Sequence, residues 1–424
     1  MLSINKIYSW LFVIALLIQI PSIHLMKFLD ELLVVFMMSL VFLDVLVNKQ
    51  YAKYKVLWVV FGVMFFYALY TFVFRTYNIP KAICIDFIAQ LKPFCYFCVS
   101  YAVVPKLGRN IKILLKNICV FNSIIVLFCF LMGLTEDVFF HVTYLGLVSV
   151  ISFMVYIICS IDENNKLSKR DLIIALMLLT IGLVSTRTKF YGEYIVALYL
   201  LLLYTPGVLK KKQTGNIIVG IIVLGVMLVV SWSKIDYYFI SGGNLDMAFD
   251  EDLLETFARP VMYISMFSVL ALHPILGSGL ASYGTYASMS AVNYSLLYGV
   301  IGIDDVWGLS ENYDAFICDA FYPELAQFGV LGIGLFIFLF VWMYRKISLF
   351  LYTSGKLFYV VGIVAFMVLM IENVASTTFN QGAGAMCMMI LGYLCASFKH
   401  ITKEEAKKIR ENPYVDKNAL EYLK

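Results

Sequence analysis

Two arginines stand in contexts that suit the binding of a phosphate-containing group. Arg187 lies in the short segment STRTK, residues 185–189, between two apolar runs. Arg259 precedes Pro260 and another apolar run. Because proline is favoured at the first position of a helix, we expect Arg259 at an N-cap, beside free backbone N–H groups. A guanidinium at the positive end of a helix suits an anion, phosphate above all.

No motif for a metal or a cofactor accompanies these arginines. There is no phosphate-binding P-loop and no Gly-x-Gly-x-x-Gly segment after a strand. Cys95 and Cys98 have the spacing of a metal pair, but neither a second pair nor a histidine lies near them in the sequence. The adjacent Asp304 and Asp305 are more typical of a solvated turn than of a metal site. We therefore expect a function that needs no cofactor and no metal.

The composition is that of a membrane protein. Of 424 residues, 62% are hydrophobic and only 14% are charged, whereas soluble domains carry about 25% charged residues. The formal net charge of +4 excludes a nucleic-acid-binding protein that depends on bulk positive charge. The composition also excludes a disordered chain and a small disulfide scaffold. We predict an all-α polytopic membrane protein.

A membrane-spanning helix needs about 20 mostly apolar residues. Windows of that length predict twelve transmembrane helices, at 7–25, 29–47, 56–74, 83–104, 113–133, 142–160, 171–186, 189–206, 215–233, 323–344, 356–372 and 379–398. The predicted organisation is 1–233 for helices one to nine, 234–322 for a large periplasmic loop with short helices, 323–398 for helices ten to twelve and 399–424 for a cytoplasmic tail.

The positions of lysine and arginine predict the orientation. With the N-terminus inside, most of them fall in the inner segments, as the positive-inside rule requires, and both termini are cytoplasmic. The apolar start of the chain continues into a second span without a signal-peptide cleavage site. Arg187 and Arg259 are exceptions on the outer face. An alternative for Arg187 is a side chain that anchors a helix end by extending to the membrane surface.

Ionisable residues inside the predicted spans are also candidates for function, because burying them in a bilayer is costly. Glu193 follows Arg187 by about one and a half helical turns and could pair with a cation near it. Glu372 borders the last outer turn and could contact a substrate. Asp86 and Gln90 have the i,i+4 spacing that places them on one helix face, which predicts a polar contact between helices.

Taken in order, these features resemble a known family. Arg187 in its short turn, Arg259 in a long outer loop, HPILGSG at 273–279 and YPELAQFGVLG at 322–332 resemble the bacterial O-antigen polymerase and O-antigen ligase superfamily. The resemblance implies glycosyl transfer at the outer face of the bacterial inner membrane, between sugars carried on undecaprenyl pyrophosphate. A polymerase extends the polysaccharide, O-antigen or capsule, by moving the growing chain onto the next lipid-linked repeat unit. A ligase moves the finished chain onto lipid A core.

Within this superfamily the sequence favours a polymerase. Ligases carry a His-Asn pair late in the outer loop, where this chain has Glu311 and Asn312. The alternatives are a ligase and a lipid-linked oligosaccharide flippase. Transporters tend to contain an internal repeat that relates the two halves of the chain, and this sequence shows no such repeat. The implied partners are undecaprenyl-pyrophosphate-linked glycans and membrane lipid, with a chain-length regulator and a flippase of the same pathway, and no nucleic acid.

The expected chemistry assigns roles to the candidate residues. Arg187 and Arg259 would stabilise the charge on the leaving pyrophosphate. The base that takes a proton from the attacking sugar would be His273, Glu311, Asp314 or Asp319, although His273 could equally cap the end of its helix. The tyrosines of the loop suit stacking on sugar rings, but they could also be interfacial anchors. The expected substrate-binding residues are Lys189, Glu193, Gly277, Gly279, Tyr313, Tyr322 and Glu372.

Overall fold

Helices form nearly all of the regular structure. The computed structural model describes residues 4–19, 29–74, 77–104, 106–139, 141–162, 165–204, 225, 258–353, 355–401 and 403–411. Within these ranges no β-strand occurs, and the only extended pairing is an isolated bridge between Ser310 and Tyr313. The predicted all-α class is therefore confirmed for the described residues.

The helices follow the apolar runs of the sequence. The first group contains α1 (Ile4–Leu17), α2 (Leu29–Asn48), α3 (Lys55–Phe74), α4 (Pro80–Val103), α5 (Arg109–Leu131), α6 (Thr135–Phe139), α7 (Thr143–Ser160), α8 (Lys169–Ile181) and α9 (Thr188–Tyr204). The second group contains α11 (Ala258–Leu272), α12 (Leu297–Val300), α13 (Phe321–Glu324), α14 (Gly329–Ile347), α15 (Lys356–Glu372), α16 (Gly382–Ala396) and α17 (Lys403–Glu411).

Several helices are suited to a bilayer. In the described part of the chain, five helical segments are long and apolar enough to cross a membrane: Tyr51–Phe74, Pro80–Val103, Arg109–Leu131, Thr143–Ser160 and Phe321–Tyr352. This supports a membrane protein. Every predicted span overlaps a helix of the described residues except 215–233, of which only residue 225 is described. The total of twelve spans and their direction stay predictions.

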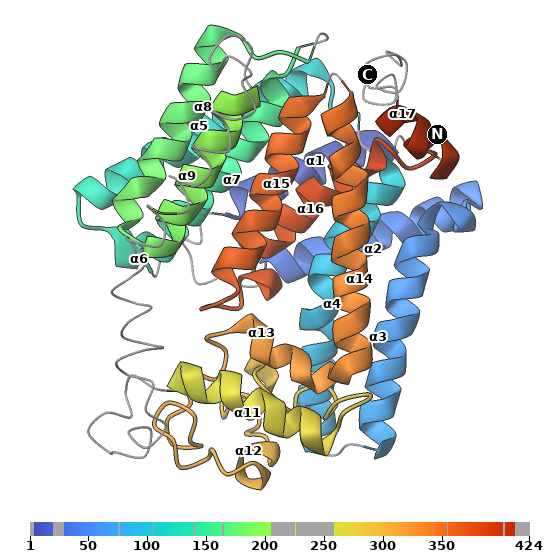
Figure 1. Cartoon of the computed structure of the whole chain (residues 1–424), viewed down its shortest axis with the longest axis vertical. Helices are drawn as coiled ribbons and strands as arrows, with labels where there is room; N and C mark the ends of the chain where they lie inside the picture. Colours follow the sequence, from blue (N-terminus) through green and yellow to red (C-terminus); the bar gives the residue numbers. More distant parts are fainter. Residues whose placement is uncertain are drawn as a thin grey trace.

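The bundle is organised around α16 (Figure 1). Every residue of this helix from Ala383 to Ala396 is buried, as expected for a helix that is apolar on all sides. Gly392 lets α16 approach α4 closely, because a β-carbon at this position would lie 2.4 Å from the carbonyl oxygen of Phe97. The charged Lys92 of α4 is also accommodated here, in a 2.7 Å ion pair with Asp30 of α2.

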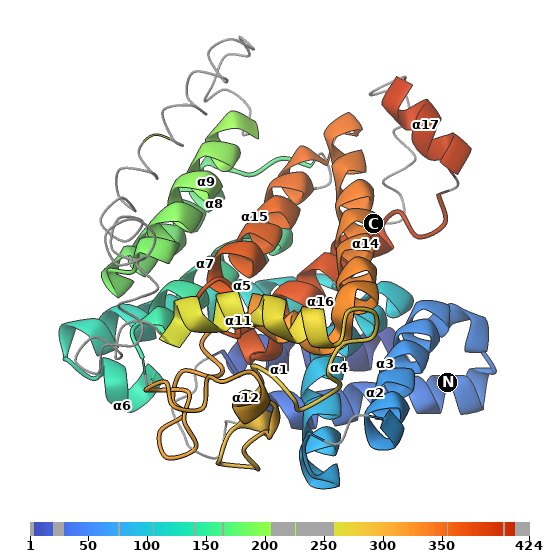
Figure 2. The ribbon, with the colours of Figure 1, turned by 60° about the horizontal axis from the view of Figure 1, so that its bottom comes forward.

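A small lobe covers one end of the bundle, and we call residues 258–320 the outer lobe. Figure 2 shows α11 lying across the helix ends, and Figure 1 shows α17 at the opposite end of the molecule. The outer lobe has its own apolar core, which includes Met262, Tyr283 and Tyr298. Helix α11 begins at Ala258, so Arg259 lies in its first turn and not at the N-cap as predicted.

Candidate functional site

Arg187 stands at the start of α9, in the loop that follows the 3-10 helix η3 (Gly182–Ser185). The left-handed backbone of Thr186 (φ 50°) turns the chain into α9, and the Arg187 carbonyl accepts from the amide of Tyr191. Arg187 therefore occupies the helix N-terminal position that we had predicted for Arg259. The first turn of α9 contains no acidic residue, so its backbone N–H groups and the guanidinium favour an anion together.

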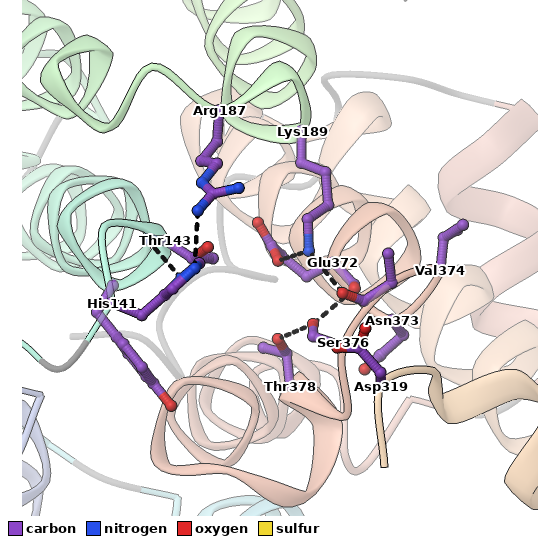
Figure 3. A network of polar contacts seen from close by, with 12 residues as sticks. His141, Thr143, Arg187, Lys189, Asp319, Glu372, Asn373, Val374, Ser376 and Thr378 are labelled. Atoms are coloured by element: carbon purple, nitrogen blue, oxygen red, sulfur yellow. Dashed lines mark hydrogen bonds and ion pairs between the residues drawn. The ribbon is translucent and has the colours of Figure 1, made fainter. Parts of the chain in front are cut away.

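The Arg187 guanidinium contacts a histidine and no carboxylate (Figure 3). Its Nη2 donates to Nε2 of His141, just before α7, over 2.7 Å. None of the ion pairs among the described residues involves Arg187. The remaining N–H groups of Arg187 are therefore available for an anion.

Lys189, two residues after Arg187 and in the first turn of α9, is paired with Glu372. Its Nζ lies 2.7 Å from Oε2 of Glu372 at the end of α15 and 3.2 Å from the carbonyl oxygen of Ala375. Glu372 is buried, so this pair joins α9 to α15. Glu193 is also buried near Lys189 and Glu372, but neither of its carboxylate oxygens hydrogen-bonds within the described structure. The cation that we expected for Glu193 is thus bonded to Glu372 instead.

Arg259 and Asp319 form a partly exposed ion pair between α11 and the segment before α13. Asp319 lies in the same close view as Arg187, Lys189 and Glu372 (Figure 3), and its charge acts on His141. The structure therefore brings together both predicted arginines, Lys189, Glu372 and one of the four candidate bases. They come from the starts of α9 and α11, the end of α15 and the segment before α13.

The other three candidate bases have different contacts. His273 follows the last residue of α11, and its Nε2 lies 2.7 Å from the hydroxyl oxygen of Tyr77. At 1.5 Å per residue, α11 separates His273 from Arg259 by roughly 20 Å. Glu311 is exposed, its backbone carbonyl accepts from Ser290, and the Asp314 carboxylate accepts from the Ser290 amide. Among the described ion pairs, Asp319 is the candidate base that pairs with one of the two arginines.

Four residues expected to bind substrate have packing contacts within the protein, and their binding of substrate stays a prediction. Gly277 (φ 76°) and Gly279 (φ 90°) fold the outer lobe onto the start of α14, where the Gly279 amide donates to the carbonyl of Gln327 over 3.0 Å. The Tyr322 hydroxyl donates to the carbonyl of Met370, which ties α13 to α15. The ring of Tyr313, which is exposed, packs at a tilt against Trp307, with 4.5 Å between the ring centroids.

His141 is a member of the site that the sequence did not reveal. It belongs to no motif, and only its position directly before the predicted span 142–160 hinted that it lies at a helix end. Desolvation and the charges of Arg187 and Lys189 lower the pKa of His141 below its ordinary value of 6.5. The neutral ring can therefore accept the hydrogen bond from Arg187.

We expect this histidine to make the folded state sensitive to acid. Because the folded pKa is lowered, the unfolded chain binds the proton more readily, so the contribution of His141 to stability is present above about pH 6.5 and is lost as the pH falls through the lowered value. The measurement is the thermal unfolding midpoint from about pH 8 to about pH 5. His141→Gln, which keeps an acceptor but does not titrate, should flatten the curve; an unchanged curve would contradict this role.

An apolar groove of about 410 Å³ lies beside the site, between α3 and α14. Val59 and Val63 of α3 face Leu335 and Leu339 of α14 across it. Phe321 and Phe379 also line the groove, two residues after Asp319 and one residue after Thr378 respectively. Phe321 thus connects the wall of the groove to the chain segment that carries Asp319.

The atoms of the site that could bind a ligand are side-chain oxygens and nitrogens. Within the described ranges, no three His, Cys, Asp or Glu residues lie together in a way that could hold a metal ion. No family model, curated protein or solved structure matches the chain.

Proposed function

We propose that the protein polymerises undecaprenyl-pyrophosphate-linked oligosaccharide repeat units into a surface polysaccharide at the outer face of the bacterial inner membrane. It would act as a glycosyltransferase without a metal. The observation that carries the proposal is Arg187, a guanidinium at a helix N-terminus with no carboxylate partner in the described structure. Such a group suits a pyrophosphate leaving group.

The paired residues suggest how the transfer proceeds. The acceptor hydroxyl attacks the anomeric carbon, the bond from that carbon to the pyrophosphate oxygen breaks, and the hydroxyl proton passes to Asp319. Once Asp319 is neutral, it no longer holds the charge of Arg259, which can then turn to the departing pyrophosphate. The charge on the leaving group is thus compensated as it develops.

The groove between α3 and α14 supports the choice of a lipid-linked donor. Its walls are almost entirely apolar, and one of its lining residues, Phe321, lies two positions after Asp319 in the chain. A polyprenyl chain in the groove would gain the stabilisation of buried hydrocarbon while its pyrophosphate reaches Arg187. Lys55 marks the other end of the groove.

A pair of carboxamide variants tests the assignment of the base. Asp319→Asn should lower polysaccharide extension by about 100-fold or more, because it removes the proton acceptor and the partner of Arg259. Glu311→Gln should leave extension nearly unchanged, since Glu311 is exposed and forms no ion pair with either arginine in the described structure. The measurement is the rate of polymer formation from lipid-linked repeat units in proteoliposomes. Equal loss in both variants would contradict the role of Asp319.

The proposed activity itself is tested by the gel profile of surface polysaccharide from cells lacking the gene, with and without its restoration. A ladder that collapses to a core bearing a single repeat unit is the expected result, because attachment to the core continues while extension is lost. Absence of any repeat unit on the core, with long lipid-linked chains accumulating, would identify a ligase. Single lipid-linked units trapped on the inner face would identify a flippase.

A further inference from the structure

A second polar cluster is buried between α4, α16 and the outer lobe. Its members come from four segments that are far apart in the sequence: α4, α13 with the 3-10 helix η8 (Leu325–Phe328), the 3-10 helix η10 (Thr378–Asn380) and the outer lobe. Two carboxylates, Asp86 and Glu324, are each only 1% exposed. The polar side chains around them are Gln90, Gln327, Asn380 and Thr285.

The hydrogen bonds within the cluster satisfy one carboxylate better than the other. Asp86 accepts from the amide of Ala281 over 2.6 Å with one oxygen and from Nε2 of Gln90 over 3.2 Å with the other. Glu324 accepts from Gln90 and from Nδ2 of Asn380, both at its Oε1. All of these donors are N–H groups, and none belongs to a lysine, an arginine or a histidine.

Several buried side-chain atoms of the cluster are left over. Oε2 of Glu324, Oε1 of Gln327, Oδ1 of Asn380 and Oγ1 of Thr285 have no hydrogen-bond partner among the described residues, and neither does Nε2 of Gln327. Gln327 is fully buried and lies beside Asp86. A buried oxygen without a partner costs free energy, and a buried carboxylate oxygen costs the most. The same cluster therefore combines negative charge with several unused oxygens.

We propose that this cluster is a binding site for Na⁺. Its oxygens would surround the ion, and the ion would neutralise Glu324. A Ca²⁺ or Mg²⁺ site ordinarily uses several free carboxylate oxygens or waters, whereas both oxygens of Asp86 already accept N–H bonds and only one oxygen of Glu324 is free. Transition metals prefer imidazole nitrogen or sulfur ligands, and none of the residues named above is a histidine or a cysteine. The donor set therefore fits a hard monovalent ion.

The backbone around the cluster also fits a cation. The helical segment from α13 to α14 is interrupted, with a 3-10 turn over Leu325–Phe328 and a positive φ of 61° at Gly329. Sodium ions in membrane proteins are characteristically held where helices are broken, because unwound backbone exposes carbonyl oxygens. A bound ion would tie α4 and α13 to η10, next to the candidate active site, and so hold the outer lobe on the bundle.

The test compares cations on the purified full-length protein in detergent micelles. At equal ionic strength, NaCl should raise the thermal unfolding midpoint by roughly 3 °C relative to KCl and choline chloride, and the shift should saturate with Na⁺ concentration. Glu324→Gln should abolish the difference between the salts. The matched control Glu311→Gln, which changes an exposed carboxylate of the outer lobe, should retain it. Equal midpoints in all three salts for the native protein would overturn the proposal.

A second measurement tests the site on the native protein alone, in case the Glu324 variant does not fold. Binding of ²²Na⁺ to the native protein should be saturable, with one ion per chain, and unlabelled Na⁺ should displace it while K⁺ should not. Absence of saturable binding would overturn the site, and displacement by K⁺ at equal concentration would overturn its assignment to Na⁺. Both measurements read binding and not transfer, so the site stands or falls independently of the proposed polymerase activity.

Discussion

Replacing Arg187 with alanine should reduce polysaccharide extension by at least about 100-fold, the loss typical of removing one charge-stabilising donor from an enzyme site. Arg187 is the guanidinium of the site that no carboxylate of the described structure neutralises, so its loss removes the group best placed to receive the pyrophosphate. Polymer formation from lipid-linked repeat units, measured at matched protein levels, gives the effect directly.

Two further variants separate this role from general effects of charge. Arg187→Lys keeps the positive charge but loses the planar fork that binds a phosphate at two points, so most of the loss should persist. Arg345→Ala, which changes an exposed arginine near the far end of α14, should behave like the native protein. If Arg187→Ala still made long chains at a normal protein level, the proposed anion site would be wrong.

Replacing Gly277 with alanine should prevent the outer lobe from seating on the bundle. A β-carbon at this position would lie 2.3 Å from the carbonyl oxygen of Gln327 and 2.4 Å from the amide nitrogen of Gly329. Both neighbours are backbone atoms, so the start of α14 must move and the bond from Gly279 to Gln327 is lost. We expect a destabilisation of about 3 kcal/mol or more, seen as loss of monodisperse protein on size-exclusion chromatography.

Gly302 provides a matched control for the backbone conformation. It has a similar positive φ of 69°, but no heavy atom lies within 4 Å of its β-carbon position. Gly302→Ala therefore carries only the cost of the left-handed conformation, roughly 1–2 kcal/mol. A similar yield of folded protein from both variants would show that close approach at Gly277 is unimportant.

The helices were predictable because a long apolar run has few other ways to satisfy its backbone in a bilayer. The runs at 56–74 and 142–160 became α3 and α7 almost residue for residue. The stretch before His273 was likewise predicted as a helix, because Pro260 starts it and Pro274 stops it. The predicted position of Arg259 was wrong by one residue, because Arg259 lies within α11 and not at its N-cap. The arginine that directly precedes a helix is Arg187, before α9.

Which residues lie together in the site depends on contacts between segments that are far apart in the chain. Such contacts leave no pattern in a single sequence. Arg259 and His273 are neighbours in motif order, yet a rigid helix keeps them apart. His141 belongs to no motif, although it contacts Arg187 across 46 positions of the chain. Gly277 and Gly279 were predicted as ligand contacts, and the structure adds a packing reason for both: the backbone of Gln327 leaves no room for a β-carbon at Gly277 and accepts a hydrogen bond from Gly279. A glycine in a loop is consistent with a ligand contact and with close backbone packing, and the sequence alone does not distinguish the two.

The enclosure of α16 has a consequence for biosynthesis. This helix is made after all the helices that surround it, including α4, on which Gly392 packs. The earlier helices must therefore enter the membrane before the helix at the centre of the bundle has been made. They can reach their final contacts only after α16 has left the ribosome and packed between them. A chain that is truncated before residue 382 would lack the helix at the centre of the bundle and not only a helix at its edge. Cellular quality control should therefore recognise it as unassembled.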